Sequence, residues 1–171
     1  MTAEPTQRFP LAPMSGVIRV LTAAVLAIPA VFVAAGLVTS AAILVPVGVV
    51  TALLYVAIWL AGRPTVFEVA QDGLHIRFPW RSRAVPAREI AGVRELSSRT
   101  FREEFGFAVR IGVGGLWGGF GWLWTSQRGL VELYVSRLDG FVLVERRAGG
   151  MPLLLTPAEP EDFVDALSAL L

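Results

Sequence analysis

The most constraining feature of this sequence is a run of 43 residues, from Val20 to Gly62, in which no side chain is charged. An α-helix rises 1.5 Å per residue, so the run would span about 64 Å, roughly twice the ~30 Å hydrocarbon core of a bilayer. Two crossings fit this length and one does not. A polar Thr-Ser pair within residues 38–41 indicates a break. The sequence therefore predicts a transmembrane hairpin over 17–62, with helices at about 17–38 and 42–61.

The positions of the arginines predict the orientation of this hairpin. Arg8 and Arg19 precede the first helix, several arginines follow the second helix closely, and the loop between the helices has none. Positively charged flanks stay on the cytoplasmic side of a membrane. We therefore expect a multi-pass protein of the inner (cell) membrane with both termini in the cytoplasm. Residues 1–16 would form an N-terminal cytoplasmic tail, and residues 63–171 a cytoplasmic domain.

From Pro64 onward, the pattern changes to the alternation of short β-strands. Residues 65–69 and 74–78 alternate on either side of an Asp-Gly pair, which is a strong β-hairpin signal. Further short strands are indicated at 83–85, 90–96, 105–111, 129–136, 140–146 and 151–155. Apolar residues recur at helical spacing over 161–171. The sequence thus predicts an α+β class chain, with about seven antiparallel strands closed by a C-terminal α-helix.

A series of short motifs runs through this region. It comprises Val66-x-Glu68, Asp72-Gly73-Leu74, Val85-Pro86, Glu89-Ile90, a glycine-rich stretch after Gly106, and a closing Thr156-Pro157-x-x-Pro160-Glu161-x-Phe163. After two apolar helices, this order of motifs resembles the bacterial membrane-anchored PH-like (pleckstrin-homology-like) domain proteins. The resemblance implies a PH-like antiparallel β-barrel or sandwich of two near-orthogonal sheets, with one open end capped by the helix. It implies no catalytic residue.

The residue content argues against an enzyme. The chain has no cysteine and one histidine, which excludes disulfides, thiolate nucleophiles and multi-histidine metal sites. His75 falls on the polar face of a strand without a serine nucleophile motif. Glu103 and Glu104 are adjacent, and on a strand they would point to opposite faces. A Gly-Val-Gly begins at Gly112, but Trp117 occupies the place of the third glycine of a dinucleotide motif. We expect no cofactor, no metal and no enzymatic activity.

A basic segment follows the first predicted hairpin. Between Arg77 and Arg102 there are seven arginines and two glutamates. Each arginine near a membrane surface is attracted to anionic lipid by about 1 kcal/mol. Trp80, together with Arg77, Arg81 and Arg83, would suit the headgroup layer. The alternative is that these arginines lie on exposed strand faces and pair with acidic residues. Nucleic-acid binding is disfavoured, because the domain is slightly acidic and lacks a stacking motif.

A glycine-rich stretch with large aromatic residues occupies 106–124. Trp117, Phe120 and Trp122 alternate with glycines, and no charge occurs between Arg110 and Arg128. An apolar loop of this size exposed to water would promote aggregation. Three interpretations stay open: a β-hairpin in the domain core, contact with lipid headgroups, or a surface for a protein partner.

The sequence therefore predicts a non-enzymatic binding or scaffolding module at the cytoplasmic face of the inner membrane. Its expected partners are the lipid bilayer, anionic lipid headgroups and a membrane protein, but no nucleic acid. The candidate contact residues are Arg77, Trp80, Arg81, Arg83, Trp117, Phe120 and Trp122. The alternative function is a structural or regulatory subunit of a membrane protein complex, which engages partner helices through the hairpin and the glycine-rich segment.

Overall fold

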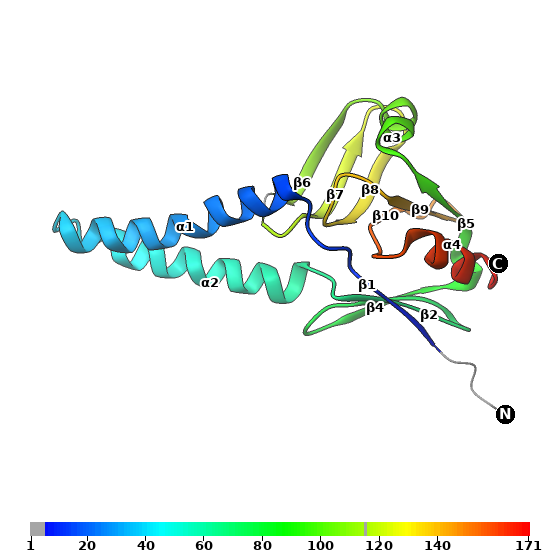
Figure 1. Cartoon of the computed structure of the whole chain (residues 1–171), viewed down its shortest axis with the longest axis horizontal. Coiled ribbons are helices and arrows are strands. Elements are labelled where there is room, and N and C mark those ends of the chain that lie inside the picture. The colour runs from blue at the N-terminus through cyan, green and yellow to red at the C-terminus, as the bar shows by residue number, and fades with distance from the viewer. Residues whose placement is uncertain (1–5, 115) are drawn as a thin grey trace.

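Two long helices project from one end of a β-rich domain in the computed structural model, which describes residues 6–114 and 116–171 (Figure 1). They are α1 (Gly16–Val38) and α2 (Leu44–Gly62). Both are long and apolar enough to cross a membrane, and only 17% and 6% of their most apolar windows are buried within the structure. Their bounds closely match the two segments expected from the uncharged run.

Two glycines bring the helices together near the turn that connects them. A Cβ on Gly48 would lie 2.7 Å from the carbonyl oxygen of Pro29, and a Cβ on Gly36 would lie 2.8 Å from Cγ2 of Val45. Only glycine fits at such distances, so the backbones approach closely here. Toward the domain, the two helices diverge (Figure 1).

A four-stranded antiparallel sheet forms one layer of the domain. Its order is β1-β2-β3-β4, where the strands are β1 (Gln7–Pro10), β2 (Val66–Ala70), β3 (Gly73–Arg77) and β4 (Ser82–Pro86). The β2–β3 hairpin turns at the expected Asp-Gly pair, and Gly73 has a φ of 138°. Strand β1 lies within residues 1–16, which the sequence predicts as a tail, and its residues 7–10 pair with β2.

The second sheet has six strands in the order β5-β9-β10-β8-β7-β6. They are β5 (Ile90–Leu96), β6 (Ala108–Gly114), β7 (Gly119–Thr125), β8 (Gly129–Val135), β9 (Phe141–Arg146) and β10 (Leu153–Leu155). The expectation of antiparallel pairing throughout is corrected at one place, since β10 runs parallel to β8. A short 3-10 helix, η1 (Ala87–Glu89), connects the two sheets.

Two helices complete the domain and create two hydrophobic clusters. The C-terminal helix α4 (Pro160–Ser168) inserts Phe163 between the sheets, where its ring meets Phe9 at 5.3 Å and Phe67 at 6.1 Å. The helix α3 (Ser98–Phe105) packs on the other face of the six-stranded sheet, with Phe105 fully buried. The predicted α+β architecture is confirmed: two apolar helices, then a β-rich domain with a C-terminal helix. Helix α3 lies where the sequence indicated only loop and the start of a strand.

Candidate functional site

The turn between β3 and β4 lies against the end of α2, on the side of the domain from which the helices project. Nε of Arg81 donates a hydrogen bond to the carbonyl oxygen of Ala61, at 3.1 Å. The Arg81 guanidinium also lies 4.1 Å from the centre of the Phe78 ring. Trp80, at the tip of the turn, is 80% exposed. This turn therefore presents one aromatic and one cationic side chain beside the helices.

Three arginines on this side have no carboxylate partner within the described chain: Arg19, Arg63 and Arg81. Arg19 lies in the first turn of α1, and Arg63 directly follows α2. Nε of Arg63 is buried and makes no hydrogen bond, and desolvation by burial lowers the pKa of this guanidinium. We call Arg19, Arg63, Trp80 and Arg81 the helix-side face. No acidic residue occurs from residue 6 to residue 67, the stretch that contains Arg19 and Arg63.

Arg77 and Arg83, by contrast, make ion pairs within the domain. Nε of Arg77 lies 2.7 Å from Oε2 of Glu68. Arg83, on β4, pairs with Glu132 on β8 and so joins the two sheets. The hydroxyl of Tyr134 donates to the same Glu132 carboxylate, and burial raises the pKa of this phenol above its ordinary value. These two arginines thus differ from Arg81 in having carboxylate partners.

The glycine-rich stretch forms the β6–β7 hairpin, which places its aromatic residues in different environments. Phe120 is 3% exposed, faces Tyr134 across the β7–β8 pair and belongs to the core between the sheets. Trp122 lies on the same face of the sheet but is 49% exposed, next to the exposed Trp124 and Ile111. The interpretation of this stretch as a β-hairpin in the domain core therefore fits Phe120. Trp122 instead lies in an exposed apolar strip with Trp124 and Ile111.

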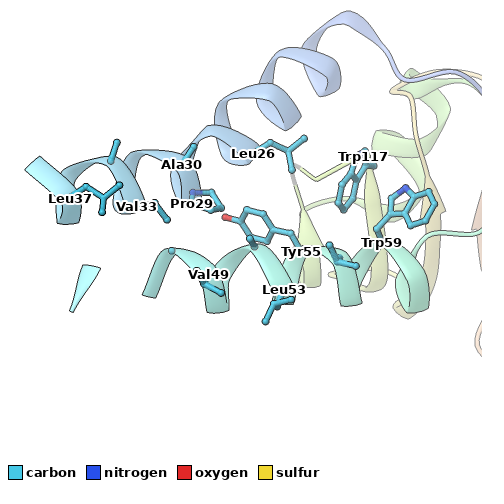
Figure 2. A pocket seen from close by; sticks show the side chains of 14 residues that line it. Leu26, Pro29, Ala30, Val33, Leu37, Val49, Leu53, Tyr55, Trp59 and Trp117 are labelled. Atoms are coloured by element: carbon cyan, nitrogen blue, oxygen red, sulfur yellow. The ribbon is translucent and has the colours of Figure 1, made fainter. Parts of the chain in front are cut away.

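Trp117 closes a groove between the two long helices. Its backbone N–H donates to Oγ1 of Thr22, at 2.9 Å, which ties the β6–β7 connection to α1. The groove has a volume of about 880 Å³ and an apolar lining. Trp59 and Trp117 lie together at its domain end, and the ring of Tyr55 projects into it (Figure 2). Sequence reasoning selected Trp117 but missed this groove, because the gap depends on how far the helices diverge.

The described residues include no group of three or more His, Cys, Asp or Glu side chains arranged to hold a metal ion. Nε2 of His75 lies 2.9 Å from Oδ1 of Asp72. This hydrogen bond lowers the pKa of the exposed Asp72 carboxyl. The pair stands at the β2–β3 turn, apart from the helix-side face.

Comparison with protein families identifies the β-rich region. The bacterial PH domain model matches residues 65–171, from the start of β2 to the end of the chain. This chain belongs to the bacterial PH domain family. Comparison with curated proteins and with solved structures finds no match. The family match confirms the resemblance drawn from the motif order.

The family region excludes three elements of this bacterial PH domain protein: β1 and the two long helices. PH-like domains are generally non-catalytic binding modules. Two members of the helix-side face, Arg19 and Arg63, were not among the sequence candidates. The sequence does carry a signal for these two arginines. Arg19 lies one helical turn before Thr22, and Arg63 lies one turn after Trp59.

Proposed function

We propose that this protein is a non-enzymatic, membrane-anchored binding module whose PH-like domain contacts anionic lipid headgroups at the cytoplasmic face of the inner membrane. Anchoring is supported by the exposure of α1 and α2, whose apolar side chains have almost no cover within the structure. Apolar surface of this extent is unfavourable in water and favourable in a bilayer. Since α1 is tied to the domain through Thr22, it is also an integral part of the fold.

The orientation follows from the charges at the helix ends. Arg19 and Arg63 lie at the ends of α1 and α2 that join the domain, and the turn at residues 39–43 carries no charge. The positive-inside rule places the arginine-bearing ends, and therefore the domain, in the cytoplasm. Both termini belong to this same side in the proposed arrangement.

The proposed contact with anionic lipid headgroups rests on the helix-side face. In this orientation, its three arginines without carboxylate partners lie at the level of the lipid phosphates. The exposed Trp80 suits the interface, where an indole ring has both apolar and polar neighbours. An arginine guanidinium donates paired hydrogen bonds to phosphate. With about 1 kcal/mol per arginine near the surface, the face would add about 3 kcal/mol of preference for an anionic bilayer.

Hydrogen exchange of the full chain in lipid nanodiscs tests this function. We expect the 78–81 turn to exchange more slowly in nanodiscs that contain phosphatidylglycerol than in nanodiscs of phosphatidylcholine alone. The difference should disappear in the variant Arg63→Gln/Arg81→Gln, which removes two of the three cations. The matched control is Arg88→Gln/Arg147→Gln, which removes two other arginines without carboxylate partners among the described residues. Equal exchange in the two lipid compositions contradicts the headgroup proposal.

One observation favours the alternative of a structural or regulatory subunit. The groove between α1 and α2 is open, apolar and large enough for side chains of a partner helix. A photocrosslinker at Ala52, which lines the groove, would then capture a discrete protein in native membranes. The same crosslinker at Ala57, which is exposed on α2 but does not line the groove, would capture none.

A further inference from the structure

A second hollow lies on the face of the six-stranded sheet that α3 covers, opposite the first sheet. Its volume is about 400 Å³, within the range of small-molecule sites. Apolar side chains from the central strands form much of the lining, together with residues of α3 and β6. The apolar members include Leu123, Leu133, Val135, Phe141 and Leu154, which belong mostly to the cluster beneath α3. These five side chains are themselves buried, between 1% and 8% exposed, and form the floor of the hollow.

Two arginines line this pocket, Arg102 from α3 and Arg110 from β6. Neither guanidinium forms an ion pair or a hydrogen bond within the part of the chain that the structure describes. The acidic residues nearby are already engaged by other arginines. Glu103 pairs with Arg99, Glu104 with Arg94 and Arg128, and Glu145 with the same two arginines. The pocket thus combines an apolar lining with two uncompensated positive charges.

The backbone of β7 accommodates one of these charges. A Cβ on Gly119 would lie 3.0 Å from Cζ of Arg110 and 3.0 Å from Cδ2 of Leu133. The absence of a side chain at Gly119 therefore lets the Arg110 guanidinium lie over the sheet beside an apolar neighbour. Desolvation of the guanidinium lowers the pKa of Arg110, although the residue as a whole is exposed. A partly desolvated guanidinium of this kind gains most from an anionic ligand.

We propose that this pocket binds a single-chain amphipathic carboxylate, with the acyl chain on the apolar lining and the carboxylate held by Arg102 and Arg110. The planar guanidinium donates two parallel hydrogen bonds to a carboxylate, which supplies the recognition of the head. The acyl chain would fill the hollow against the leucine and phenylalanine side chains that line it. The pocket volume favours such a small ligand over a protein segment. This site lies on a different face from the turn at 78–81.

Photoaffinity labelling of the full chain in phosphatidylcholine nanodiscs tests the proposal. The probe is dodecanoic acid that carries a diazirine in its chain, and mass spectrometry locates the labelled peptides. We expect label in the segments 98–110 and 133–141, which line the pocket, in addition to label on α1 and α2 from probe dissolved in the lipid. Unlabelled dodecanoate should suppress the pocket label, whereas dodecanol, with the same chain and no charge, should not.

Matched variants separate the charge from the apolar lining. Arg102→Gln/Arg110→Gln should lower the pocket label by roughly tenfold or more, because hydrogen bonds to charged groups are the strongest contacts available there. Ala108→Phe, which fills the pocket, should lower it as well, with Ala91→Phe on an exposed strand position as the control. Arg88→Gln should leave the label unchanged.

Three results would overturn the proposal. The first is label confined to α1 and α2. The second is equal suppression by dodecanol and dodecanoate, and the third is full labelling of the double arginine variant. The outcome is independent of the headgroup proposal, because that proposal is measured by exchange at 78–81 and this one by label at the α3 pocket.

Discussion

At the scale of single residues, the buried Glu132 depends on Arg83. Glu132 is 5% exposed, pairs with Arg83 from the other sheet and accepts a hydrogen bond from Tyr134. Its Oε2 makes no further hydrogen bond. Removing Arg83 would leave a buried carboxylate without its cation, which is far more destabilising than losing a surface ion pair.

We therefore expect Arg83→Met to lower the free energy of unfolding by about 3 kcal/mol. Chemical denaturation of the full chain in mild detergent, followed by tryptophan fluorescence, measures this change. The double variant Arg83→Met/Glu132→Leu removes both charges and should recover most of the loss. A single-variant loss within the ~0–1 kcal/mol typical of exposed pairs would show that Arg83 does not hold the sheets together.

The arginines also show which ion pairs can be predicted from the sequence and which cannot. Arg77, Arg81 and Arg83 look alike in the sequence, yet of these three only Arg81 has no carboxylate partner among the residues that the structure describes. The partner of Arg77 lies on the neighbouring strand of a hairpin whose register the sequence does indicate. The partner of Arg83 lies 49 residues away on the other sheet, and no local pattern carries that information.

At the scale of secondary-structure elements, β1 joins the N-terminal segment to the PH-like domain. Phe9 on β1 is 5% exposed and meets Phe163 of α4. Beyond β1, the N–H of Ala12 donates to the carbonyl oxygen of Thr156, at 2.9 Å. The segment before α1 therefore forms part of the domain core, although the matched family region begins at residue 65.

We expect Phe9→Ala to lower the free energy of unfolding by about 3–5 kcal/mol, the usual effect of deleting a buried phenylalanine ring. Gln7→Ala, an exposed position on the same strand, should change it little. The denaturation measurement described for Arg83 applies here too. Equal, small effects of the two substitutions would mean that β1 is dispensable for the stability of the domain.

Elements with strong local signals were predictable, and those with weak signals were not. The long helices, the Asp-Gly hairpin and α4 each follow from a pattern within one segment. Strand β1 has only four residues, too few for alternation to stand out from the surrounding sequence. Helix α3 begins with a capping residue, Ser97, whose side chain accepts the Thr100 N–H, but the eight-residue helix is mostly polar and was missed. The parallel β8–β10 pair depends on long-range topology.

At the scale of the whole molecule, the domain and the hairpin form one connected structure. The chain enters α1 directly from contacts with the six-stranded sheet, where the hydroxyl of Ser136 donates to the carbonyl oxygen of Ala12. It leaves α2 beside the β3–β4 turn, where Arg81 bonds to Ala61. Together with the bond from the Trp117 N–H to Thr22, these contacts attach both helices to the domain. A bilayer around α1 and α2 would therefore fix which face of the domain meets the lipid.

The most direct test of this account is the topology of the hairpin, and the absence of native cysteines makes it simple to measure. Ala42→Cys places a thiol in the turn between the helices, and Leu171→Cys places one at the C-terminus. A membrane-impermeant thiol reagent should label Ala42→Cys in intact cells, and Leu171→Cys only after the membrane is opened. Label at Leu171→Cys in intact cells, or recovery of the protein in the soluble fraction, would contradict a membrane-anchored module with a cytoplasmic domain.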